Sequence, residues 1–152
     1  MQTRIVIGIG IGMFAALCGS LACSPVKTDA HAATKDVVRA MFHALNEHDV
    51  TMMVSLYAED AVVLSPEQCE PLVGRPAIAS SYQDLFDQVP DVKDTISIMI
   101  AEGERAAVEF VASSEIEGAE FQLPIAAILT VQDGLIVRDV GYFDSDIEKQ
   151  CE

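Results

Sequence analysis

The chain has few basic residues, and this scarcity narrows what it can bind. Nine lysines and arginines stand against 24 aspartates and glutamates, which gives a formal net charge of −15 at pH 7 over 152 residues. A field of that sign repels nucleic acid and anionic membrane surfaces, so we expect neither to bind the domain itself. The acidic residues are spread over predicted turns and strand ends, which is typical of a solvated surface.

Long apolar runs are absent except at the start of the chain. Ile5 to Leu17 is an unbroken apolar run that follows a single cation, Arg4, as in the core of an export signal. The segment after it, up to Ala22-Cys23, resembles a bacterial lipoprotein signal, which implies lipid attached to Cys23. Ordinary cleavage after Ala32 and an uncleaved membrane anchor are the alternatives. All three interpretations place the domain outside the cytoplasm.

The segment next to Cys23 refines this expectation. Ser24 in that position resembles the sorting signal of outer-membrane lipoproteins. We therefore predict a signal peptide over residues 1–22, a lipidated cysteine and tether over residues 23–33, and a folded domain over residues 34–148. The expected location is the periplasmic side of the outer membrane, with a soluble periplasmic or secreted protein as the alternative.

Cysteine and histidine are also scarce, and neither has the spacing that is typical of catalytic or metal-binding sites. No CxxC pair occurs, and the three histidines, at positions 31, 43 and 48, fall in a predicted linker, a helix and a turn. We therefore predict no catalytic thiol, no metal and no cofactor. A disulfide between Cys69 and Cys151 would close a loop of about 80 residues and stabilise the fold by roughly 4 kcal/mol. Two unpaired thiols are the alternative.

The apolar periodicity changes once along the domain, from helical to alternating. Three helices are expected, carrying Val37 to Leu45, Met52 to Tyr57 and Ile78 to Val89, with a strand from Ala61 to Leu64 before the third. After Pro90 the period becomes two, which predicts strands at Ile96–Ile100, Ala106–Ser114, Phe121–Val131 and Leu135–Phe143. Helices first and a curved antiparallel sheet last predict an α+β fold.

Four short segments, ALNEHD, LYAEDAVVLSP, GRPAI and QDGLIV, occur in that order along these elements. Together they resemble the SnoaL-like branch of the nuclear transport factor 2-like superfamily, over Thr34 to about Ile147. The resemblance implies a cone-shaped barrel, in which a curved antiparallel sheet and three N-terminal helices surround a pocket. Because this fold hosts isomerases, epoxide hydrolases, polyketide cyclases and simple binding proteins, function has to be argued from the site.

Two enzyme types of this fold can be compared with the chain position by position. Ketosteroid isomerases need a tyrosine, a base aspartate and a protonated aspartate where this chain has Met41, Ser65 and Ala126. The LPI, DG and YFD segments of the last hairpin resemble limonene-epoxide-hydrolase-like proteins. Their catalytic arginine and two aspartates correspond to Phe110, Ala112 and Gly141. Neither set of catalytic groups is present, so we predict neither reaction.

The resemblance also implies which side chains line the pocket. If Ala126 points inward, the wall is apolar with a few hydroxyls, and the residues expected to line or approach it are Met41, Ser65, Tyr82, Phe110, Ala112, Ile128, Asp139, Gly141 and Phe143. Such a wall suits a small apolar or weakly polar molecule. The first hypothesis is therefore an exported binding domain without catalysis.

Two further hypotheses remain. The domain could be a hydrolase, isomerase or cyclase that uses Asp139 or one of the tyrosines Tyr57, Tyr82 and Tyr142, and burial of Asp139 beside a polar partner would favour this. It could instead be a dimeric interaction module. We expect a homodimer through the outer sheet face, which we assign to the apolar side chains Leu123, Ile125, Ala127 and Leu129.

Overall fold

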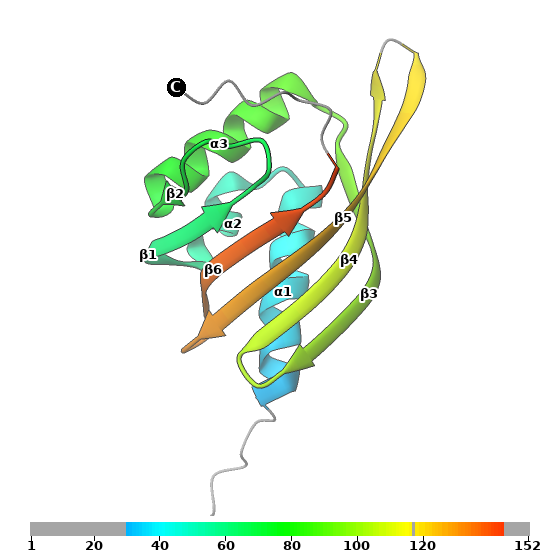
Figure 1. Cartoon of the computed structure of the whole chain (residues 1–152). Coiled ribbons are helices and arrows are strands. Elements are labelled where there is room, and N and C mark those ends of the chain that lie inside the picture. Colours follow the sequence, from blue (N-terminus) through cyan, green and yellow to red (C-terminus); the bar gives the residue numbers. More distant parts are fainter. Residues whose placement is uncertain (1–29, 117, 145–152) are drawn as a thin grey trace, which may run out of the picture.

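Three helices pack against one side of a curved sheet (Figure 1). The computed structural model describes residues 30–116 and 118–144. Its helices are α1 (Ala30–Asn46), α2 (Val50–Ser55) and α3 (Arg75–Gln88). Its strands are β1 (Tyr57–Leu64), β2 (Leu72–Val73), β3 (Lys93–Glu102), β4 (Arg105–Ile116), β5 (Ala119–Gln132) and β6 (Leu135–Tyr142). The predicted α+β class is confirmed.

The sheet has the strand order β2-β1-β6-β5-β4-β3 and is open, because β2 and β3 are its two edges. Neighbouring strands are antiparallel except β1 and β6, which run parallel. Register shifts leave an extra residue in β3 between Ile96 and Ile98, and one in β6 between Ile136 and Arg138. Such bulges increase the local twist and bend a strand, so the sheet curves around the helices as a cone without closing into a barrel.

Helix α1 begins earlier than the sequence predicts. Residues 30–33, which we expected in a tether, form its first turn. The turn between β3 and β4 holds them, because the Gly103 amide donates to Nδ1 of His31 over 2.8 Å and the Thr34 hydroxyl donates to the Gly103 carbonyl over 2.8 Å. The predicted signal peptide, Cys23 and the rest of the tether lie outside the described residues.

The boundary between α2 and β1 also differs from the prediction. Asp49 caps α2 as expected, since its carboxylate accepts a hydrogen bond from the Met52 amide over 2.8 Å. The helix, however, ends at Ser55, and Tyr57 begins a strand. Pairing with β6 decides this, because Tyr57 lies opposite Ile136, whose amide donates to the Leu56 carbonyl over 2.8 Å.

The two faces of β5 are the reverse of those predicted. Ala127 lies opposite Val108 of β4 and Ala126 opposite Glu109, so Ala127 shares the inner face with the core. The side chains that we assigned to a dimer interface, Leu123, Ile125, Ala127 and Leu129, therefore face the helices and the cavity beneath them. Alternate residues of a strand point to opposite faces, so this register places Ala126 and Ile128 on the outer face.

Two remaining features concern the environment of the chain. Within residues 30–116 and 118–144, no helix is both long enough and apolar enough to cross a membrane. Cys69 is disulfide-bonded. Its predicted partner, Cys151, lies outside the described residues, so the pairing of these two cysteines stays a prediction.

Candidate functional site

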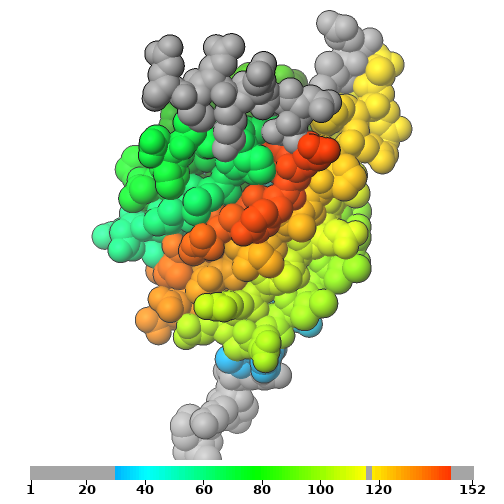
Figure 2. Space-filling view, viewed as in Figure 1, coloured from blue at the N-terminus to red at the C-terminus, as the bar shows by residue number. Residues whose placement is uncertain are grey.

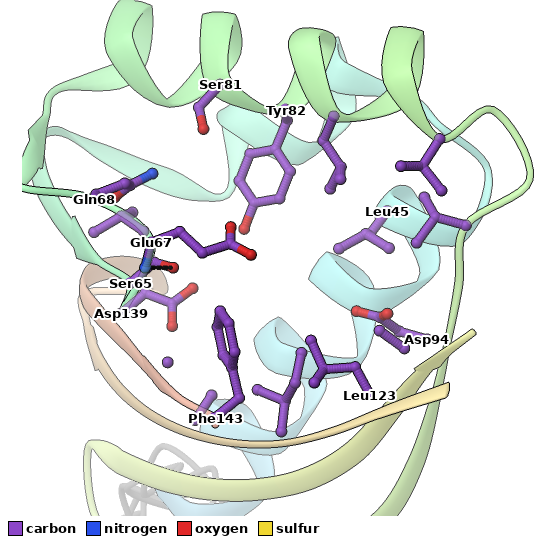
Figure 3. A pocket seen from close by; sticks show the side chains of 18 of the residues that line it. Leu45, Ser65, Glu67, Gln68, Ser81, Tyr82, Asp94, Leu123, Asp139 and Phe143 are labelled. Atoms are coloured by element: carbon purple, nitrogen blue, oxygen red, sulfur yellow. Dashed lines mark hydrogen bonds between the residues drawn. The ribbon is translucent and has the colours of Figure 1, made fainter. Parts of the chain in front are cut away.

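A cavity of about 930 Å³ lies between the helices and the inner face of the sheet (Figure 3). Helix α1 contributes Met41 and Leu45, α3 contributes Tyr82 and Leu85, and the strands supply most of the opposite wall. Apolar side chains dominate this wall. A cavity of this size and character is typical of sites that bind a small molecule.

Most of the predicted lining residues lie on this cavity. Eight of them do so: Met41, Ser65, Tyr82, Phe110, Ala112, Asp139, Gly141 and Phe143. The prediction is wrong for Ala126 and Ile128, which point away from the cavity because of the register of β5. Tyr142 is 56% exposed, so its hydroxyl is not a cavity group. That the eight residues bind a ligand stays a prediction.

Asp139 is a buried carboxyl on the cavity wall. It lies on β6, between Val63 of β1 and Leu129 of β5, and is 7% exposed. The hydroxyl of Tyr57 donates a hydrogen bond to its Oδ2 over 2.9 Å. Tyr57 is itself fully buried, and its carbonyl accepts from Nε of Arg75 over 2.7 Å. The Tyr57 side chain that holds Asp139 is therefore itself fixed, by its burial and by the contact of its backbone with Arg75.

Burial sets the protonation state of this group. It raises the pKa of Asp139 to about 6, although the hydrogen bond from Tyr57 lowers it. Burial also raises the pKa of Tyr57 and Tyr82, and the charge of Asp139 raises both further. Both tyrosines therefore stay neutral while Asp139 titrates. A carboxyl with a pKa close to neutral can take up and release a proton during a reaction.

Asp94 is a second buried carboxyl on the same wall, and it is not among the site residues predicted from the sequence. It is 9% exposed, and burial raises its pKa to about 7. Our predicted strand began at Ile96, which left Asp94 in a connection. The alternation of Val92, Asp94 and Ile96 was the available signal, because residues two apart in a strand share one face.

The charged residues of the cavity are all of one sign in the described part of the chain. Glu67 and Asp84 join Asp94 and Asp139 among the lining residues, and that set contains no lysine, arginine or histidine. Across the part of the chain that the structure describes, no three His, Cys, Asp or Glu side chains gather as metal ligands would. The polar chemistry of this site therefore comes from separate carboxyls, tyrosine hydroxyls and serines.

Comparisons with known proteins agree with this architecture. A candidate ketosteroid isomerase from Kribbella flavida is 25% identical, with a TM-score of 0.65 over 80% of this chain and 85% of that one. A protein with a ketosteroid isomerase-like fold from Catenulispora acidiphila, solved with trimethylamine, is 22% identical, with a TM-score of 0.65 over 70% and 84%. A candidate polyketide cyclase from Streptomyces antibioticus is 22% identical, with a TM-score of 0.66 over 73% and 91%.

A search for similar curated proteins finds no match. The family model described as the SnoaL-like domain matches residues 38–139, from within α1 to within β6, and this range holds most of the cavity wall. Because this match spans well over half of the chain, the protein belongs to the SnoaL-like family.

Proposed function

We propose that the domain binds a small, mainly apolar molecule in the cavity and that Asp139 transfers a proton to or from it. The observation that carries this proposal is the burial of Asp139 on the cavity wall, 2.9 Å from the Tyr57 hydroxyl. Burying a carboxyl costs free energy, and binding an apolar molecule does not require one. The geometry therefore favours an enzyme over a domain that only binds.

The side chains around Asp139 suggest their roles. The hydrogen bond from Tyr57 occupies Oδ2, so Oδ1 is available to take a proton from a carbon next to a carbonyl group. The hydroxyl of Tyr82 points into the cavity (Figure 3) and can donate a hydrogen bond to the oxygen on which negative charge develops. This is chemistry of the isomerase or cyclase type, which the names of two similar structures also suggest.

The proposal does not extend to epoxide opening. The positions that correspond to the charged groups of limonene-epoxide-hydrolase-like proteins, Phe110, Ala112 and Gly141, do line the cavity. None of these three side chains can activate water. The resemblance to those hydrolases stays a prediction about sequence, and hydrolysis is not part of the proposed function.

Proton transfer can be tested without the natural substrate. In D2O, the domain should accelerate the exchange of the hydrogens next to the carbonyl of 2-tetralone, followed by NMR. Asp139→Asn should abolish the acceleration, whereas Asp87→Asn, which removes an exposed carboxylate on the outside of α3, should not. If the wild type is no faster than buffer but retains an apolar molecule in native mass spectrometry, binding without catalysis replaces this proposal.

We also propose that the protein is exported and anchored to a membrane by lipid on Cys23. The support is the apolar run from Ile5 to Leu17 and the residues that precede the cysteine. In a bacterial host, the mature protein should fractionate with membranes and begin with a cysteine that carries the mass of a lipid. Cys23→Ala should remove both properties, and a mature protein that begins at Ala33 would contradict the proposal.

We propose, in addition, that two copies associate through the outer face of the sheet. Figure 2 shows that no helix covers β6, β5 and β4 on this side. Large apolar side chains are exposed there, including Ile98, Ile100, Ile128 and Tyr142. Burying them against a second copy would remove an apolar surface from water. Light scattering that shows a monomer at micromolar concentration would contradict this proposal.

A further inference from the structure

Asp94 is the buried carboxyl that the proposed proton transfer does not use. Its side chain points into the cavity at the end that Leu45 and Leu123 line, whereas Asp139 stands on the other side, near Ser65 and Glu67 (Figure 3). Among the described residues, no side chain or backbone group donates a hydrogen bond to its carboxylate oxygens. The carboxyl is more than nine-tenths buried and faces an apolar cavity, so its oxygens can accept a hydrogen bond from a ligand that enters the cavity.

The backbone of Asp94, in contrast, is held firmly. The side-chain amide of Asn46 donates to the Asp94 carbonyl over 2.9 Å and accepts from the Asp94 amide over 2.7 Å. Nζ of Lys93 also donates to the carbonyl of Asn46. These contacts join the last residue of α1 to the start of β3. They fix the direction of the Asp94 side chain without occupying its oxygens, as a preorganised binding group requires.

The charge of the cavity decides which ligand fits that group. Among the described residues, four with carboxyl groups and none with a basic group line the wall, so an anionic ligand would meet only charges of its own sign there. A bare metal ion would need several oxygen ligands, and among the residues that the structure describes no three His, Cys, Asp or Glu side chains gather to supply them. An organic ammonium group needs no such shell, because it can donate a charge-assisted hydrogen bond to a single carboxylate.

We propose that Asp94 binds the protonated amine of a ligand whose apolar body fills the cavity. This inference rests on the proposed function and narrows it, since it makes the substrate class apolar amines. The apolar wall between Asp94 and Asp139 would contact the hydrocarbon part of the ligand, and the ammonium would donate the hydrogen bond that Asp94 lacks. A neutral ligand with a hydroxyl in place of the ammonium could donate only an uncharged hydrogen bond to that carboxylate, which is weaker than one from an ammonium.

Three probes with one apolar body and different head groups test the proposal: 4-phenylbutylamine, 4-phenylbutanol and 4-phenylbutyrate. Titration calorimetry at pH 8 should show the amine binding at least about 10-fold more tightly than the alcohol, with the carboxylate weakest. Asp94→Asn should remove the advantage of the amine and leave the affinity for the alcohol within about threefold, which also shows that the variant is folded. Asp87→Asn, the matched loss of one exposed carboxylate, should keep the advantage.

A second variant separates this proposal from the proposed catalysis. Asp139→Asn should lose the exchange activity on 2-tetralone and keep the preference for the amine. If exchange fails in the wild type while the amine preference depends on Asp94, the catalytic proposal falls and this one stands. The inference is overturned if the amine and the alcohol bind equally, if the amine does not bind at millimolar concentration, or if the preference depends on Asp139 rather than Asp94.

Discussion

The replacement Asp94→Asn should stabilise the protein at alkaline pH, because the native carboxylate destabilises it there. Burial raises the pKa of Asp94 from its ordinary value of 3.8 to about 7. Between these two values the folded protein holds a proton that the unfolded chain has released. Stability therefore falls as the pH rises through this window, and the full cost is present above pH 7.

The size of the effect follows from the difference between the two pKa values. At about 1.4 kcal/mol for each pKa unit, the ionised Asp94 lowers the free energy of unfolding by about 4 kcal/mol above pH 7. An asparagine has almost the same shape and no charge, but its amide also lacks a partner, which costs about 1–2 kcal/mol. We therefore expect the variant to be more stable than the wild type by about 2–3 kcal/mol at pH 8.

Urea unfolding followed by circular dichroism, at pH 8 and at pH 5, measures this difference. At pH 5 the folded wild type holds the proton on Asp94, so the advantage of Asp94→Asn should shrink by about 2–3 kcal/mol. Tyr82, the titratable neighbour on α3, has a raised pKa and stays neutral throughout. The control Asp87→Asn should differ from the wild type by the same small amount at both pH values. An advantage of Asp94→Asn that does not change with pH would refute the reasoning.

Three further predictions concern the site, the fold and the outer face. The rate of hydrogen exchange on 2-tetralone should rise with pH through about 6 and then level off, since Asp139 must be ionised to act as the base. In the wild type the hydrogen bond from Tyr57 lowers the pKa of Asp139, so Tyr57→Phe should move the midpoint of this profile to higher pH. A flat profile from pH 5 to 8 contradicts this prediction. Gly74→Ala should lower the free energy of unfolding in urea by about 1–2 kcal/mol, because Gly74 has φ +83° and a Cβ there would lie 3.1 Å from the Glu59 carbonyl oxygen. In the control Gly103→Ala the new Cβ meets no atom within 4 Å, so the loss of stability should be smaller. Ile100→Glu on the outer face should halve the mass seen by light scattering, and Met52→Glu, an exposed change on α2, should not.

Local patterns in the sequence were enough to predict most of the fold. The apolar stripe of α1, the Asp49 cap and the alternation after Pro90 each depend on residues close together in the chain, and the structure has the elements that they predict. The start of β1 could not be predicted in this way. Tyr57 follows a helical stripe and becomes part of a strand because it pairs with Ile136, which lies far along the chain.

The site was predictable to the same extent. Asp139, Tyr82 and most of the apolar wall were identified from strand parity and resemblance, and these positions do line the cavity. Ala126 was assigned to the wrong face because one residue of slip in a strand reverses every side chain, and only the pairing of Ala127 with Val108 and Gly141 fixes the register. Asp94 was missed because its strand starts earlier than its apolar residues suggest.

The two buried carboxyls differ in their partners, and this difference divides the proposed work between them. Asp139 has the Tyr57 hydroxyl, whose hydrogen bond lowers its pKa and so favours the ionised form that a base needs. Asp94 has no donor among the residues that the structure describes, so it gains most from a cationic ligand. The two carboxyls lie on different sides of the cavity (Figure 3). When the nitrogen of an amine ligand is bound at Asp94, the carbon next to Asp139 is therefore one that lies far from that nitrogen. The acidic C–H of the substrate should therefore lie beside a carbonyl at the far end of the molecule from the amine.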